Sequence, residues 1–497
     1  MIWKIAKKEF LLNLMTFKFA VGTIVCVVLT AVFMPVLVND YEQRLQKYNK
    51  KVADNEAELR KVRVYKNITP TLYRPPALLS VFNAGLERRL GDSAKIELES
   101  IPEVDAAPAG DNHYLSIFPV LDASLILKIV LSLLAILIAY DSISGERERG
   151  TLRLILANST ARHQVLLGKL LAGVVTLIVP TTIAFVVGVL VLELSPMAAL
   201  TLSDWARIGL MYVASLIFIA AMYNIGLLFS CLANRSAISL ILGLFFWVVC
   251  VAVIPNLSVY IATRIQPLEP KEKTDDQIAS LRSELRKLWW DALFAAQRGR
   301  DPSQSDTEGA FGNGYTKGWN TDFFERQQGL NPVGEPLKIK YADRIWEVEH
   351  GYLKNVWKQR QLANNLSRIS LIFSYENATS VLAGTDLSSF QYFVSRAKAY
   401  RSQIIEYIRS RTENFRSPSY WTPFSKEYAS DYGESKKEAP DIADHPRLNL
   451  QDLPPCTYRL DLAESVRRAI PDLALLVFAN VLFFALSFVA FMKGDVR

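Results

Sequence analysis

The sequence has few residues that could cross-link the chain or bind a metal ion. It contains four cysteines among 497 residues. Cys26, Cys231 and Cys250 fall in or at the ends of long apolar runs, which leaves Cys456 alone in the large polar region. No disulfide is therefore expected within that region, and its fold must depend on core packing. The four histidines lie far apart, and none has a second ligand at the spacing of a zinc or copper site.

Motifs for nucleotide binding and catalysis are missing as well. The stretch SGERERG at 144–150 has two glycines at the spacing of a phosphate-binding loop, but Thr151 follows where a P-loop has lysine. The chain also lacks a G-x-S-x-G motif. Its net charge of +7 is spread out without a basic tract, which argues against nucleic-acid binding. We therefore expect a chain that is not an enzyme and binds no cofactor itself.

Long hydrophobic runs, by contrast, are abundant. A helix that crosses a bilayer needs about 20 mainly apolar residues, and such runs predict six transmembrane spans. The predicted spans are 17–37, 117–140, 170–192, 209–230, 237–255 and 471–491. The other segments are an interfacial helix at 1–16, insertions at 38–116 and 256–470, a loop at 141–169 and a tail at 492–497. The predicted fold class is an all-α polytopic membrane protein with two mostly helical insertions.

Basic residues near the span ends predict the orientation in the membrane. The N-terminal end carries Lys4, Lys7, Lys8 and Lys18, and the loop at 141–169 carries Arg147, Arg149, Arg153, Arg162 and Lys169. The short loop on the other side, ELSPMAALTLSDW, has only Glu193 and Asp204 as charged residues. Both termini and the loop are therefore expected to be cytoplasmic, and both insertions extracytoplasmic.

Apolar periodicity predicts long helices in both insertions. Apolar residues from Tyr41 to Val62 recur every three, four or seven positions, so the first span should continue outward as an amphipathic helix. Three more stripes, at 278–288, 345–366 and 390–408, predict helices that need packing partners. The best strand candidate is KIELESI at 95–101.

Polar residues interrupt two of the predicted membrane elements. Asp122 and Lys128 fall in the second span, where a charge costs several kcal/mol unless it reaches the interface or faces a polar interior. We expect Lys128 either to snorkel to the outer interface or to point toward a cavity between subunits. In the helix at 1–16, Glu9 and Asn13 interrupt the face opposite the lysines.

The loop after the second span is the most unusual polar segment. Residues 144–152, SGERERGTL, combine charged side chains with two glycines. Gly150 permits a sharp change of direction, and Thr151 can cap a following helix whose leucines would lie on the membrane or on a partner. On the residues alone, a docking element and a solvated loop are equally good interpretations.

This loop and its surroundings resemble the ABC-2-type permeases, the membrane subunits of ABC exporters. In that family an E-x-E-x-G-T-L element is followed by a basic residue and by Gly-Lys at the start of the next span. The matching residues are Glu146, Glu148, Gly150, Thr151, Leu152, Arg162, Gly168 and Lys169. The stretches YRPPALLSVFNAGLERRLGD and ANVLFFALSFVAFMKGDVR resemble a bacterial and archaeal subgroup with large extracytoplasmic insertions.

The resemblance implies a location, partners and a mechanism. In a prokaryotic plasma (inner) membrane, the loop would be a coupling helix resting on a separate ATPase subunit that binds ATP and Mg. ATP would close an ATPase dimer and thereby switch a dimer of this permease, with a second copy or a paralogue, between inward and outward openings. The charged residues Glu146, Arg147, Glu148, Arg149 and Arg153 would hold this joint. Charge reversal at either glutamate is then expected to uncouple transport without affecting folding.

Two other function classes stay open at this point. A membrane-anchored scaffold or binding protein could recruit an envelope partner through the outer domain. An envelope enzyme is a third alternative, which the missing catalytic motifs disfavour. The stretch GERERGTL beside a six-span core favours the transporter, whose cargo could be lipid-linked, a peptide or a protein.

Overall fold

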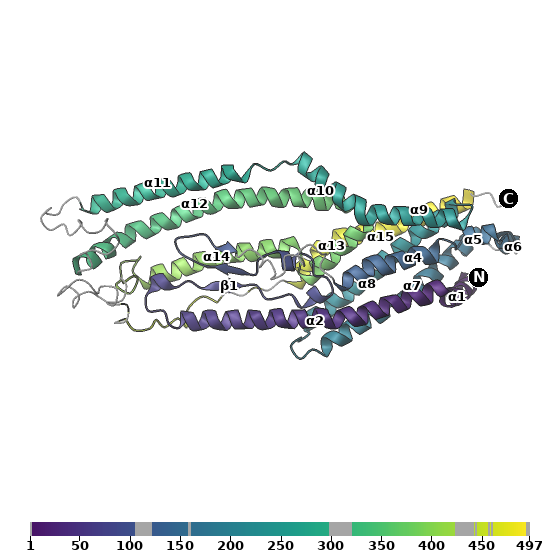
Figure 1. Cartoon of the computed structure of the whole chain (residues 1–497), viewed down its shortest axis with the longest axis horizontal. Helices are drawn as coiled ribbons and strands as arrows, with labels where there is room; N and C mark the ends of the chain where they lie inside the picture. Colours follow the sequence, from purple (N-terminus) through teal and green to yellow (C-terminus); the bar gives the residue numbers. More distant parts are fainter. Residues whose placement is uncertain are drawn as a thin grey trace.

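The computed structural model of the chain describes residues 2–104, 122–157, 161–297, 321–422, 442, 445–455, 458 and 461–493. The molecule is an elongated and almost wholly helical rod (Figure 1). The most apolar helices gather toward one end, and the insertions extend from them toward the other (Figure 1). Both ends of the chain lie at the tip of the apolar half (Figure 1).

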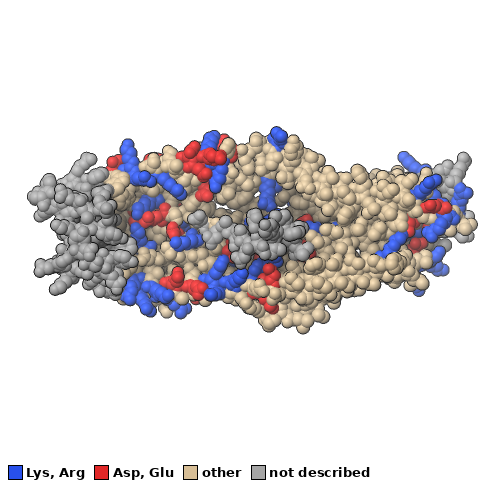
Figure 2. All heavy atoms as spheres, in the orientation of Figure 1, with Lys and Arg blue, Asp and Glu red and all other residues tan. Residues whose placement is uncertain are grey.

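Six helical runs in the described residues are long and apolar enough to span a bilayer, which confirms the expected all-α polytopic fold class. Figure 2 shows a surface band over these runs that is almost free of charged side chains. The elements that form them are α2 (Phe17–Leu59), α3 (Ala123–Ile126), η4 (Leu127–Leu131), α4 (Ser132–Ala139), α5 (Ser144–Glu148), α7 (Arg162–Glu193), α8 (Leu202–Leu232), α9 (Ser236–Val248), η5 (Val249–Val253), α10 (Ile254–Ile265) and α15 (Leu462–Lys493).

Helix α8 forms the centre of the membrane bundle. It packs against α4, α7, α9, α13 (Leu371–Ala383) and α15. Its Phe218 ring stacks on Tyr375 of α13, with 4.6 Å between the ring centroids. Gly173 of α7 lies so close to Tyr223 of α8 that an added Cβ would be 2.0 Å from the tyrosine ring. Small residues thus let the central helices approach one another closely.

Helix α2 carries the chain out of the membrane bundle, as its apolar periodicity predicts. It has 43 residues, which corresponds to about 65 Å of helix. This length is roughly twice the thickness of the hydrocarbon core of a bilayer. The preceding helix α1 (Ile2–Leu14) lies along α7 at the opposite end of the molecule.

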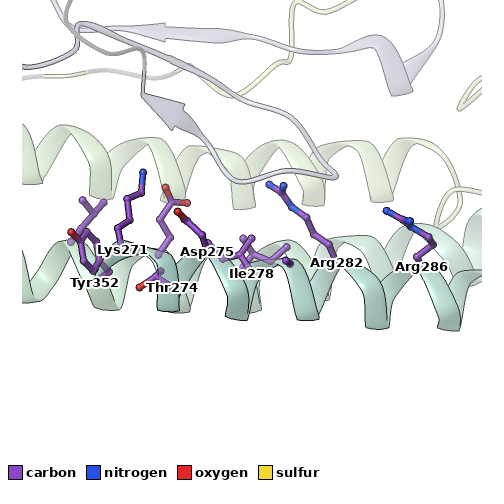
Figure 3. Close-up of a pocket in the computed structure, with 11 residues that line it drawn as sticks. Lys271, Thr274, Asp275, Ile278, Arg282, Arg286 and Tyr352 are labelled. Atoms are coloured by element: carbon purple, nitrogen blue, oxygen red, sulfur yellow. The ribbon is translucent and has the colours of Figure 1, made fainter. Parts of the chain in front are cut away.

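The predicted amphipathic helices of the large insertion are present. They are α11 (Lys271–Gln297), α12 (Thr321–Ser367) and α14 (Leu387–Arg411). Helices α11 and α12 run side by side (Figure 1) and line a solvent-open cavity of about 570 Å³. Lys271, Arg282 and Arg286 follow one another along α11 at this cavity (Figure 3). Their side chains are exposed, so these charges remain solvated.

A small sheet lies around the predicted strand, but its strands flank that segment. The antiparallel strands are β1 (Thr71–Tyr73), β2 (Ser93–Lys95) and β3 (Glu103–Val104), and the short 3₁₀ turns are η1 (Tyr65–Asn67), η2 (Leu78–Val81) and η3 (Glu87–Arg89). Of the predicted strand at 95–101, only Lys95 lies in a strand. The carbonyl oxygens of Glu97 and Leu98 instead accept hydrogen bonds from the buried guanidinium of Arg401, at 3.0 and 2.6 Å.

Helix α13 joins the insertion to the membrane bundle. It lies within the segment 256–470 that the sequence assigns to the external domain, yet it packs against α8 and α15 in the core of the bundle. Arg368, just before α13, donates to both carboxylate oxygens of Asp472 in α15, at 2.7 and 3.1 Å. Because Asp472 is fully buried, this bidentate pair fixes α13 against the last span.

Candidate functional site

The segment after α4 turns back on itself in two short helices. These are α5 (Ser144–Glu148) and α6 (Thr151–Ala157), at the end of the bundle that holds both chain ends (Figure 1). The Ser230 hydroxyl oxygen of α8 accepts hydrogen bonds from the backbone N–H groups of Ile143 at 2.9 Å and Ser144 at 3.0 Å, which fixes the start of α5. Gly150 has a φ of +74°, and this left-handed conformation makes the predicted change of direction.

Helix α6 turns part of its surface to solvent. Thr151 begins α6 and does not cap it from outside, because its hydroxyl donates back to the Glu146 carbonyl oxygen at 3.3 Å. Leu152 is buried, whereas Leu154 is 68% exposed. Arg153 is also exposed. An apolar and a basic side chain of α6 are therefore accessible to a second protein.

Two charged side chains of α5 form hydrogen bonds with the ends of neighbouring helices. Arg147 donates to the carbonyl oxygens of Ala233 at 3.0 Å and Cys231 at 3.3 Å, where α8 ends. Glu148 accepts hydrogen bonds from the backbone N–H and the hydroxyl of Ser236, at 3.1 and 2.7 Å, where α9 begins. A cation at a helix C-terminus and an anion at an N-terminus are both stabilised by the helix dipole. These contacts fasten α5 to α8 and α9.

Lys169 of α7 is the centre of a buried group of three charges. Its ammonium lies 2.8 Å from Glu146 Oε1 and 3.1 Å from Glu9 Oε1. The exposed fractions of the three side chains are 3% for Lys169, 13% for Glu146 and 18% for Glu9. The Lys169 carbonyl also accepts a hydrogen bond from the Tyr223 hydroxyl at 3.0 Å. The group thus joins α1, α5, α7 and α8 at one point.

Two further residues of the motif bring other helices to this end. A Cβ on Gly168 would lie 2.8 Å from Ile5 Cγ2, so glycine allows α1 to approach α7. Arg162, at the start of α7, donates to the carbonyl oxygen of Met492 at 2.8 Å, near the end of α15. Both contacts hold the ends of the chain against the third span.

Three of the charged residues expected to hold the coupling joint make contacts within the chain. Glu146 and Arg147 turn inward to Lys169 and to the end of α8, and Arg149 donates to the Gly145 carbonyl oxygen at 3.0 Å within α5. Charge reversal at Glu146 would leave its lysine facing a second cation in a buried site. From this contact we expect charge reversal at Glu146 to destabilise the fold as well, which the sequence alone does not indicate.

Asp122 and Lys128 lie toward the insertions, far from α5. Lys128 is mostly buried, and its ammonium is 2.9 Å from Glu376 Oε2 of α13. It therefore pairs within the chain, which neither sequence expectation anticipated. Asp122 caps α3, since its carboxylate accepts from the backbone N–H groups of Leu125 at 2.8 Å and Ala84 at 3.1 Å. Both residues tie the second span to the insertions.

The contacts of the assembled site are suited to transmitting movement between helices. Its charged side chains pair with one another or with helix ends, and they link α5 to α1, α7, α8 and α9. Within the described ranges, no group of three or more His, Cys, Asp or Glu residues could hold a metal ion. A load applied to α6 would reach the spans through α5.

Comparison with known proteins identifies the family. The family model described as ABC-2 family transporter protein matches residues 3–496. The probable ABC transporter permease protein NosY of Pseudomonas aeruginosa is 35% identical over 150 residues, which cover 29% of this chain and 54% of NosY. The chain thus spans about half the length of this curated relative. The chain belongs to the ABC-2 family of transporter proteins, as a membrane subunit that is not itself an enzyme.

Proposed function

We propose that this chain is the permease of an ATP-driven exporter, and that a separate ATPase subunit, which binds ATP and Mg, docks on the exposed face of α6. The proposal rests on a difference between the two short helices, α5 and α6. Helix α5 is fastened inside the chain through Glu146, Arg147 and Glu148. Helix α6, in contrast, presents Arg153 and Leu154 to solvent. The exposed surface of α6 is therefore accessible to a partner protein.

Movement of the docked ATPase would pass through α5 into the bundle. Lys169 connects α5 to α1 and α7, Arg147 connects it to α8, and Glu148 connects it to α9. Displacing α5 would therefore shift several spans together, as in rigid-body switching of packed elements. The Lys128–Glu376 pair and α13 would extend the movement to the insertion.

A second permease, identical or paralogous, would complete the transporter. In the most apolar part of the fifth span, and likewise of the sixth, only 17% of the residues are buried within this chain. Ile241 and Phe245 of α9 and Phe478 of α15 are among their exposed apolar side chains. Lipid or a second subunit could cover these faces, and pairing of two permeases would use one of them.

The distribution of lysines and arginines supports an orientation with the chain ends in the cytoplasm. They flank the apolar band at the end that holds α1, α5 and both chain ends (Figures 1 and 2). Basic residues near span ends favour the cytoplasmic side. In a prokaryotic inner membrane, the termini and α6 would then face the cytoplasm. The insertions would be extracytoplasmic, where they could receive cargo or an envelope partner.

A charge placed on α6 tests the docking proposal. The tagged full-length chain would be purified in mild detergent from its native host, and the accompanying chains identified and quantified by mass spectrometry. Wild type should bring down a near-stoichiometric ATPase, and Leu154→Glu should reduce its recovery about tenfold, as expected for loss of one important interface contact. Lys7→Glu, an exposed site on α1 at the same end, is the matched control and should retain the ATPase.

Two results would contradict the proposal. One is full ATPase recovery with Leu154→Glu, which would place the docking surface elsewhere. The other is a wild-type chain that stays intact but carries no ATPase, which would favour a membrane-anchored scaffold that recruits envelope partners.

A further inference from the structure

A second cavity lies where the insertions meet the outer ends of the membrane helices. Its volume is about 460 Å³. The wall consists of residues from 74–87, the start of α8, the end of α13 and Tyr458, which precedes α15. The cavity is therefore at the opposite end of α8 from α5 and α6. The proposed ATPase docking makes no use of it.

Two buried arginines line this cavity. Arg74 is 7% exposed and Arg207 is 6% exposed. Arg74 donates to the Glu87 carbonyl oxygen at 3.3 Å, and its guanidinium carbon lies 5.9 Å from the centre of the Phe390 ring. Among the residues that the structure describes, no carboxylate forms an ion pair with Arg74. Because a buried charge is costly without a counter-charge, an anion in the cavity would stabilise this arginine.

The two carboxylates in the wall already have partners. Glu87 Oε1 accepts from Arg44 Nη1 and from the Ala77 backbone N–H, both at 2.9 Å, whereas its buried Oε2 has no hydrogen-bond partner among the described residues. Asp204 Oδ2 accepts from the Thr201 backbone N–H at 3.0 Å and from its hydroxyl at 2.6 Å, in the capping box that begins α8. Among the described residues, neither carboxylate forms an ion pair with Arg74.

Arg207 adds a second set of donors from the other wall. It donates through Nη1 to the Leu382 carbonyl oxygen at 3.0 Å and lies within electrostatic reach of Asp204 and Asp461. A guanidinium has five N–H donors in a planar fork, which suits the oxygens of phosphate and carboxylate groups. Both Arg74 and Arg207 line this cavity, so it holds two guanidinium groups that suit an oxyanion.

The remaining wall is largely apolar and borders the membrane surface. Its apolar residues are Pro75, Pro76, Ala77, Leu78, Leu79 and Ala383. Ser203 and Asp204, which also line the cavity, are flanked by Leu202 and Trp205, and both of these apolar side chains are exposed. They lie at the first turn of α8, which is long and apolar enough to span a membrane, and tryptophan is typical of the head-group region. A cavity beside this turn is well placed to receive a lipid head group.

We propose that this cavity binds the head group of an anionic phospholipid from the leaflet on the insertion side. The phosphate would lie between Arg74 and Arg207, and the glycerol would lie on the proline and leucine wall. The acyl chains would leave along Leu202 and Trp205. A volume of about 460 Å³ is in the usual range for small-ligand sites. The lipid site is independent of ATPase docking, so failure of one proposal leaves the other standing.

Lipid binding to the purified full-length chain in detergent tests this site. Isothermal titration with dioctanoyl phosphatidylglycerol would be compared with dioctanoyl phosphatidylcholine and with inorganic phosphate. Wild type should bind the anionic lipid, and both other probes should bind at least about tenfold more weakly. Arg74→Gln should weaken binding of the anionic lipid about tenfold, the effect of losing one charge-assisted hydrogen bond. Arg88→Gln is the matched control, since Arg88 pairs with Asp40 at 2.7 Å outside the cavity wall and should leave affinity unchanged.

A second variant keeps the test valid if Arg74→Gln does not fold. Ser203→Trp fills the cavity without removing a charge, and it should also abolish binding of the anionic lipid. Unchanged affinity in a folded cavity variant would overturn the proposal, as would a wild type that binds no lipid. If inorganic phosphate bound as tightly as the lipid, the cavity would be a site for soluble anions and the lipid proposal would be overturned. Equal affinity for phosphatidylcholine would refute the role assigned to net negative charge.

Discussion

Replacing Lys169 with methionine tests whether α5 is held by the buried charge group. The change leaves Glu9 and Glu146 near one another without their cation and keeps an unbranched side chain. Breaking a buried ion pair by removing one partner typically costs about 3–5 kcal/mol. All three side chains are largely shielded from water, so we expect a loss of unfolding free energy in that range. The matched control is Lys18→Met, because the Lys18–Asp141 pair is about one-third exposed on both sides and should contribute about 1 kcal/mol or less.

The assay is thermal and denaturant unfolding of the purified chain in detergent, followed by tryptophan fluorescence. Lys169→Met should lower the unfolding midpoint far more than Lys18→Met. Adding Glu9→Gln and Glu146→Gln to Lys169→Met should recover most of the loss, because neutral amides do not need a buried cation. Equal midpoints for the two lysine variants, or no recovery in the triple variant, would refute the reasoning.

Two further predictions concern the bundle and the insertion. Gly173→Ala should destabilise the chain because its Cβ would lie 2.0 Å from a buried tyrosine ring, whereas Gly209→Ala, with nothing within 4 Å, should be neutral or stabilising in the same unfolding assay. A melting temperature for Gly173→Ala at or above that of Gly209→Ala would contradict this packing. In the insertion, burial raises the pKa of Glu99, but Lys338 and Lys66 outweigh it, so the pKa lies below its ordinary value of 4.5. A depressed carboxyl pKa gives stability that is present above the unfolded pKa and lost as pH falls through the folded pKa. Amide protection near Glu99, corrected for intrinsic exchange, should therefore decrease as the pH is lowered past 4.5. Lys338→Met should make this decrease smaller. Protection that does not change with pH would contradict the prediction.

The membrane bundle could be predicted because consecutive residues encode each span. An apolar run longer than the bilayer core has few alternatives to a buried or membrane helix. The same holds for α2, whose apolar spacing continues from Tyr41 to Val62 and whose helix runs to Leu59. The turn at Gly150 was also predictable, because its left-handed φ suits glycine.

The internal contacts of the site depend on packing between distant segments, so the sequence did not reveal them. Glu146 and Lys169 both belong to the recognised motif, but nothing in their spacing shows that they pair. A usable indication lay in α1, where Glu9 and Asn13 interrupt the apolar face. Glu9 contacts Lys169, and Asn13 Nδ2 donates to Thr176 Oγ1 at 3.5 Å, so the interrupting residues are the ones that face α7.

Helix α13 was missed for a different reason. Its 13 residues are too few for a span, and they include serine and threonine. Those side chains are compatible with burial because they bond to the helix backbone, as Thr379 does to the Tyr375 carbonyl oxygen at 2.9 Å. The Lys128–Glu376 pair was hidden for the same reason, since its carboxylate lies on this unrecognised helix.

The central claim is that α6 is the surface on which an ATPase docks, and cross-linking in the native host tests it most directly. A photo-reactive amino acid would replace Leu154 on α6 in one variant and Trp3 on α1 in another, because both side chains are exposed at the same end of the molecule. After illumination of intact cells, mass spectrometry would identify the attached chains. We expect position 154, but not position 3, to be linked to a soluble ATPase. A correctly inserted chain that gives no ATPase adduct from position 154, or equal adducts from both positions, would contradict the account.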